Sequence, residues 1–130
     1  MTMTLPQRTE SFEVDRAGDL VRKVVPKRGK PYQHTCTLES YEAVAHAAEE
    51  LGQLEGGFTV DDLAEAAEVP MTQAAVALAF FKERGFITTH RKHNYADEGL
   101  HLDAMIEFHA LREEPAPQRP QPPATDKPSE

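Results

Sequence analysis

Apolar residues recur at helical spacing between about Leu38 and Leu51. They form one stripe of Leu38, Tyr41, Val44, Ala45, Ala48 and Leu51. Thr37 is a residue type that caps helix starts, and Gly52 is one that ends helices. The pattern therefore predicts a helix over this segment, with one face packed against the rest of the protein.

Two shorter helical segments follow, joined by a tight turn. Thr59 and Asp62 have the spacing of a capping box, and the helix they begin ends at Val69-Pro70 because proline cannot continue a helix. Helical spacing of apolar residues resumes from about Thr72 to Arg84, with Gly85 as the stop. Together these segments predict a helix-turn-helix.

Beyond Gly85 the pattern changes from helical spacing to short β-type segments. Phe86–Thr89 is rich in β-branched and aromatic residues and predicts a strand, and Arg91–Asn94 is polar and turn-prone. We expect Leu100–Leu102 to be the return strand of a hairpin with a long loop. Asp103 then caps a last helix that ends near Arg112. The predicted fold class is mainly α with a small β-hairpin.

The flanking segments differ in composition from this central part. Residues 1–36 are predicted to be a basic N-terminal arm, partly disordered, and residues 37–112 the folded domain. Residues 113–130 contain six prolines and no large apolar side chain, which predicts a disordered tail.

The net charge of −8 is unevenly distributed along the chain. Residues 1–30 carry seven Lys/Arg and four Asp/Glu, whereas residues 31–81 carry nine Asp/Glu and no Lys or Arg. Such a chain is able to present a basic face to phosphate while another face stays acidic, or to dock on a basic protein surface. Charge alone leaves both alternatives open.

The order helix, helix-turn-helix, hairpin and closing helix over residues 38–111 resembles the winged helix-turn-helix superfamily, particularly MarR-like bacterial regulators. The resemblance rests on Leu63-Ala64, Val69 at the turn, three apolar positions of the third helix, and the run Glu83–Ile87, which is similar to the family's E-x-G-L-I. Those three positions are Ala74, Leu78 and Phe81. Glu68 stands where many members carry glycine. The resemblance implies a winged helix-turn-helix domain over residues 37–112 and a transcriptional regulator that binds duplex DNA.

In DNA-binding members of this superfamily, side chains near the start of the third helix reach bases or phosphates. The corresponding polar residues here are Thr72 and Gln73, with Lys82 as the first positive charge. The other outward positions are Met71, Ala75, Val76 and Ala79. An apolar face of this kind packs against the N-terminal segment or the last helix, or else binds another protein.

Two basic segments complete the predicted DNA-binding surface. The arm contributes Arg22, Lys23, Lys27, Arg28 and Lys30. The predicted hairpin after the third helix, which corresponds to the wing of the superfamily, contributes His90, Arg91, Lys92 and His93. Alternatively, the arm is a solvent-exposed segment before the domain, and its Val24 and Val25 cover the core. We expect a homodimer, since one short helix and one wing give a small footprint on DNA.

No cofactor, metal site or catalytic site is predicted. The sets His34, Cys36, His46 and His90, His93, His101, His109 lack zinc-site spacing. Motifs for phosphate-binding loops, serine hydrolases and zinc proteases are absent, so we expect no enzyme. The single cysteine suits a reducing cytoplasm, and neither a secretion signal nor a membrane-spanning segment is recognised.

DNA binding in transcriptional control is therefore the predicted function. The alternatives are a protein-interaction domain that uses the apolar third-helix face and the acidic helices, and a metal- or redox-responsive regulator that uses Cys36 and the histidines.

Overall fold

The N-terminal part of the chain is an antiparallel sheet of three strands. A computed structural model describes residues 7–114. The strands β1 (Thr9–Val14), β2 (Leu20–Val25) and β3 (Tyr32–Cys36) lie in the order β1-β2-β3. The register pairs Val14 with Leu20 and Leu20 with Cys36, so the half-buried end of β1 meets the buried residues Leu20 of β2 and Cys36 of β3 beside the helices.

This sheet contradicts the predicted fold class, which was mainly α with a small β-hairpin. The fold is α+β, with four helices and two antiparallel sheets within residues 7–114. The prediction failed because Arg22 and Lys23 interrupt the apolar residues of β2 and gave the segment the character of a basic arm. In the structure Glu10 and Glu13 of β1 lie across from them as ion-pair partners. Such pairing between strands is not visible in the local pattern.

Four helices follow, at positions close to those predicted: α1 (Leu38–Leu51), α2 (Val60–Ala67), α3 (Met71–Glu83) and α4 (Leu100–Glu113). Thr37 caps α1 by accepting a hydrogen bond from the backbone nitrogen of Ser40. Thr59 and Asp62 form both bonds of the predicted capping box of α2. Local capping chemistry therefore sets the starts of both helices.

The turn between α2 and α3 forces one residue into an unfavourable conformation. Glu68 ends α2 with φ 58° and ψ 47°, the left-handed region that side-chain-bearing residues usually avoid. Pro70 then precedes α3 in an extended conformation. Glu68 therefore has a backbone conformation that glycine adopts easily, at the position where many winged helix-turn-helix proteins carry glycine.

The second sheet is the hairpin of β4 (Ile87–His90) and β5 (His93–Ala96). The predicted return strand at Leu100–Leu102 is wrong, because these residues form the first turn of α4. The sequence of β5 lacks the alternation of a typical strand, since its buried position holds Asn94. Only Arg91 and Lys92 separate the two strands, so the predicted long loop is a two-residue turn.

Asn94 attaches the hairpin to the segment that precedes α2. Its side-chain nitrogen donates to the backbone oxygen of Phe58 at 2.9 Å, and its side-chain oxygen accepts from the hydroxyl of Thr89 at 2.8 Å. The backbones of Phe58 and Asn94 also exchange two hydrogen bonds. A buried asparagine with these partners is satisfied, and it fixes the position of β5.

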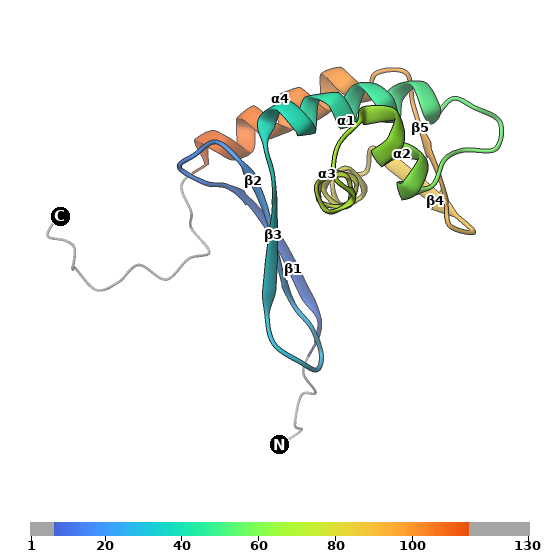
Figure 1. Ribbon diagram of the computed structural model, residues 1–130. Helices are drawn as coiled ribbons and strands as arrows, with labels where there is room; N and C mark the ends of the chain where they lie inside the picture. The colour runs from blue at the N-terminus through green and yellow to red at the C-terminus, as the bar shows by residue number, and fades with distance from the viewer. Residues whose placement is uncertain (1–6, 115–130) are drawn as a thin grey trace, which may run out of the picture.

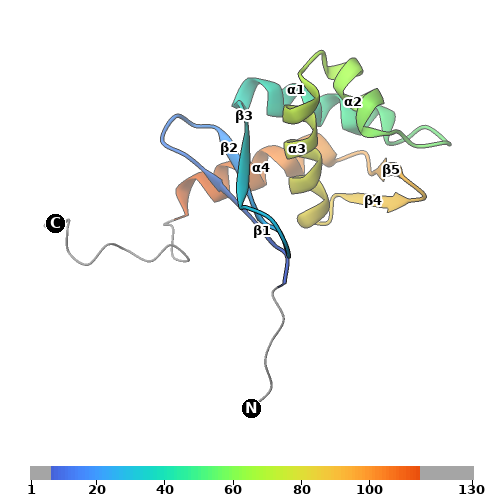
Figure 2. The same ribbon diagram turned by 60° about the horizontal axis from the view of Figure 1, so that its bottom comes forward.

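The core lies where the helices and the first sheet meet. Tyr41 of α1 packs against Phe80, Phe81 and Phe108, and its hydroxyl donates to the backbone oxygen of Ala104 at 2.6 Å. Phe12 of β1 contacts Phe80 edge to face, with ring centroids 5.2 Å apart. As Figures 1 and 2 show, α3 lies between the three-stranded sheet on one side and the β4–β5 hairpin on the other.

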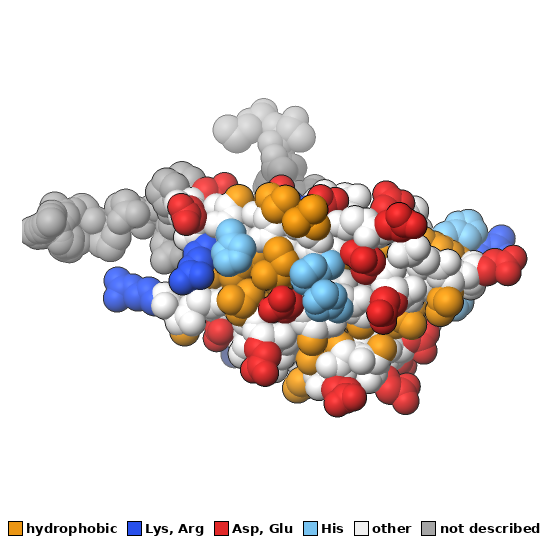
Figure 3. All heavy atoms as spheres, turned by 90° about the horizontal axis from the view of Figure 1, so that it is seen from above, with side chains coloured by type: hydrophobic (Ala, Val, Ile, Leu, Met, Phe, Trp, Pro, Cys, Tyr) orange, Lys and Arg blue, Asp and Glu red, His pale blue; other side chains and the backbone are white. Residues whose placement is uncertain are grey.

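The surface is electrostatically uneven. Acidic side chains are spread over the face that α1 and α4 form, which is the face seen in Figure 3. Within residues 7–114, no helix combines the length and the apolar character needed to cross a membrane. The proline-rich segment, predicted to be disordered, lies outside the described residues from residue 115 onward.

The left-handed residue gives a test of the turn between α2 and α3. We expect Glu68→Gly to raise the free energy of unfolding by about 0.5–1 kcal/mol, because glycine adopts this conformation without the steric cost of a side chain. The matched control is Glu65→Gly inside α2, which we expect to lower stability by about 1 kcal/mol. Urea denaturation measures both. A loss of stability in Glu68→Gly as large as in the control would contradict the described turn.

Candidate nucleic-acid interface

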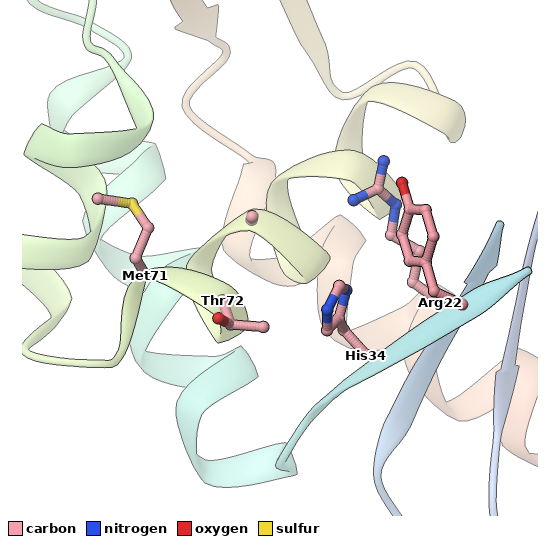
Figure 4. A pocket seen from close by; sticks show the side chains of 6 residues that line it. Arg22, His34, Met71 and Thr72 are labelled. Atoms are coloured by element: carbon pink, nitrogen blue, oxygen red, sulfur yellow. The ribbon is translucent and has the colours of Figure 1, made fainter. Parts of the chain in front are cut away.

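A groove of about 400 Å³ runs between the three-stranded sheet and the start of α3. Its lining comes from β2, β3 and α3 and comprises Arg22, Tyr32, His34, Met71, Thr72 and Ala75. Figure 4 shows that the side chains of His34 and Thr72 lie on opposite walls and face each other. Tyr32 and Met71 are both nearly half exposed, at 44% and 46%, so the groove is open to a large ligand.

The groove exists because β3 is an edge strand beside the first turn of α3. Only Cys36 of β3 is buried, and its other four residues are exposed. The start of α3 has Pro70 at its N-cap and no side-chain capping bond. The positive end of the helix dipole therefore lies beside the groove, where it favours a negatively charged group.

The apolar face of α3 is covered by the first sheet. Val76 and Phe80 are buried, and Phe12 packs on Phe80. Of the alternatives left open by the sequence, packing on the N-terminal segment is the one that the structure shows. Gln73 is also engaged, since its side-chain oxygen accepts from the backbone nitrogen of Thr37 at 3.0 Å. Thr72 remains exposed at the groove.

The predicted basic arm divides into two groups with different surroundings. Arg22 and Lys23 form ion pairs with Glu10 and Glu13 of β1, which neutralise much of their charge. The other three cations lie in the exposed loop between β2 and β3, and no salt bridge among the described residues engages them. They are Lys27, Arg28 and Lys30. This loop is the end of the hairpin that extends away from the helices in Figure 1.

The turn of the second hairpin displays two more cations. Arg91 and Lys92 have φ values of 52° and 71°, so both central residues of the turn are left-handed. Asn-Gly or Asp-Gly would adopt this geometry at lower cost. Both side chains are exposed, without a salt bridge within residues 7–114. His90 and His93 pair across the strands directly before and after the turn.

The remaining predicted cation, Lys82, lies in the last turn of α3 and is exposed. Its neighbour Arg84 has a structural role that the sequence did not reveal. The guanidinium of Arg84 lies 5.0 Å from the centre of the Phe80 ring and pairs with Glu107 of α4 at 3.5 Å. Arg84 therefore holds the end of α3 against α4 and is less available to an external phosphate.

Cys36 is placed as a buried structural residue. Burial raises the pKa of its thiol to about 12, with a further contribution from the negative charge of Asp19. A thiol with this pKa is almost fully protonated at neutral pH, whereas the thiolate is the nucleophile and the metal ligand. The geometry thus gives no support to redox sensing through Cys36.

The two histidine sets considered in the sequence are not brought together. Among the described residues, the group whose potential ligand atoms converge is instead Glu42, His46 and His101. This group was not predicted from the sequence, because His101 was assigned to a strand. The spacing of Glu42 and His46, four residues apart on one predicted helix, was a pattern that could have indicated part of it.

Comparisons of the chain with protein-family models, with curated proteins and with solved structures found no match.

The thiol gives a direct test of the packing beneath the groove. At about pH 8 we expect the folded protein to react with an alkylating reagent many times more slowly than the unfolded chain, because burial keeps the reagent away from the sulfur and raises the pKa of the thiol. Mass spectrometry with and without guanidinium measures both rates. Equal rates would mean that the junction of β3 and α1 does not bury Cys36.

Proposed function

We propose that the protein binds duplex DNA across the groove between the first sheet and α3. The β2–β3 and β4–β5 turns then contact the phosphate backbone. The observation that carries the proposal is the placement of five exposed cations at the two turns, on either side of α3, where no salt bridge within residues 7–114 engages them. They are Lys27, Arg28, Lys30, Arg91 and Lys92. Phosphate contacts of this kind supply most of the affinity of non-specific DNA binding.

The strained turn at Arg91 and Lys92 adds support. Holding two long cationic side chains in left-handed conformations costs free energy that Asn-Gly would avoid. Residues kept in such conformations cluster at functional sites. In this turn both cations lie at the tip of a hairpin that Asn94 anchors to the rest of the fold.

The groove itself supplies the contacts closer to the bases. Thr72, His34 and Tyr32 are exposed and carry groups that donate or accept hydrogen bonds. The proposal omits Gln73, Arg22 and Lys23, whose side chains are engaged within the protein. With so few polar groups near the bases, we expect backbone contacts to dominate affinity and sequence preference to be modest.

The order of α1, α2, α3, the β4–β5 hairpin and α4 supports the proposal through the resemblance to winged helix-turn-helix regulators. In this chain the first sheet is an additional element, and its β2–β3 turn supplies a second basic projection beside α3. We propose that the protein acts in the cytoplasm, which fits its single buried thiol. The homodimer predicted from the sequence stays a prediction.

The proposal predicts how DNA affinity depends on salt. We expect the logarithm of the association constant for a random duplex to fall linearly with the logarithm of salt concentration, with a slope of about 0.9 for each phosphate that the protein neutralises. Replacing Lys27, Arg28 and Lys30 with glutamine, or Arg91 and Lys92 with glutamine, leaves fewer phosphates neutralised. The slope then becomes shallower by about 0.9 for each cation that had faced a phosphate. Fluorescence anisotropy measures the slopes.

The matched control replaces two exposed cations away from the turns, Arg16→Gln in the β1–β2 turn and Arg112→Gln near the end of α4. These changes remove the same kind of charge, so we expect them to leave the slope nearly unchanged. Equal slopes for all three variants would assign binding to overall charge and contradict the proposed interface.

A further inference from the structure

We propose that Glu42, His46 and His101 form a binding site for one Zn²⁺ ion on the face of α1 and α4. Their candidate ligand atoms all lie within 4.8 Å of one another. Two imidazoles and one carboxylate are a ligand set that zinc uses in proteins, with a water molecule as the fourth ligand. In a tetrahedral site, neighbouring ligand atoms are about 3.3 Å apart, so the side chains must rotate to bring the three ligand atoms closer together around the ion.

The backbone brings the three residues together from two helices. Glu42 and His46 are four residues apart on α1 and therefore lie on the same face of that helix. His101 stands in the first turn of α4, which packs against α1. The carboxylate of Glu49, a further turn along α1, accepts a hydrogen bond from the backbone nitrogen of His101 at 2.8 Å. Glu49 thus acts as a positioning residue that holds His101 beside the other two.

The state of His101 is a separate observation that points to a ligand. Its Nε2 atom is shielded from solvent and has no hydrogen-bond partner among the described residues. The atom lies 3.7 Å from a carboxylate oxygen of Glu42, which is too long for a hydrogen bond. A shielded polar atom without a partner carries an energetic cost, which coordination to a metal ion would remove.

The side chains of the two histidines lie directly against each other. The rings of His46 and His101 are stacked, with centroids 3.7 Å apart and an angle of 16° between planes. Because nearly parallel rings direct their nitrogen lone pairs in nearly the same direction, one ring must turn before both nitrogens face the same ion. In Figure 3, two histidine side chains touch each other among acidic side chains on this face, and these acids make the surroundings favourable for a cation.

The site lies apart from the groove proposed to bind DNA. The groove is lined by β2, β3 and the start of α3, whereas the zinc ligands come from α1 and α4. An ion at this position would connect the two helices and stabilise their packing. Zinc binding at this position is therefore independent of DNA binding, and a test of one does not decide the other.

The test is isothermal titration calorimetry of the untagged full chain with Zn²⁺ at neutral pH. We expect one ion per chain, and the replacements Glu42→Gln, His46→Ala and His101→Ala to weaken binding at least about 10-fold each, the range seen when even an outer partner of a metal ligand is removed. A zinc concentration about 100 times the dissociation constant should also raise the unfolding midpoint by roughly 10 °C.

The matched controls are Glu39→Gln on α1 and His109→Ala on α4, two exposed residues of the same types outside the group. We expect both to bind zinc like the original chain. Circular dichroism without metal confirms that each variant is folded. Absence of saturable binding by the original chain, or an equal loss of affinity in the controls and the three ligand variants, would overturn the proposed site.

Discussion

The contact between the first sheet and α3 is the interaction on which the rest of the structure depends. Phe80 is fully buried between Phe12 of β1, Tyr41 of α1 and the guanidinium of Arg84. Burial of a side chain of this size contributes about 2–3 kcal/mol, and its removal costs more because a cavity remains. Without the sheet, α3 would expose the apolar face that includes Val76 and Phe80.

This contact also determines which surfaces are left for function. The sheet covers the side of α3 that the sequence offered as a protein-binding face, and it creates a groove along the start of the helix. The first sheet also carries the β2–β3 turn, with its three cations, away from the core. The β4–β5 turn carries two more cations on the other side of α3. The face of α1 and α4 stays acidic and holds the histidine pair. One packing arrangement therefore separates the cations of the two turns from an acidic face, and the two proposed sites follow from that separation.

The sequence predicted features that depend on neighbouring residues and missed those that depend on distant partners. The bounds of α1 and the capping box of α2 were predicted correctly, because Thr37, Thr59 and Asp62 act within one helical turn. The first sheet was missed, because the acids that balance Arg22 and Lys23 lie on another strand. Similarly, β5 was missed since its buried residue is Asn94, whose burial depends on Phe58 far away in sequence. Five candidate site residues lie exposed at the two turns, three of them in a sheet that was not predicted, whereas Gln73 is engaged with Thr37.

The most direct test of the central contact is a nuclear Overhauser measurement between the ring protons of Phe12 and Phe80 in the isotope-labelled chain. Ring centroids 5.2 Å apart place some of these protons close enough for a cross-peak. A cross-peak that disappears in Phe12→Leu, while the rest of the spectrum stays dispersed, is the result that this account predicts. A well-dispersed spectrum of the original chain without that cross-peak would contradict the packing of the sheet on α3, and with it the groove and the proposed position of the β2–β3 turn.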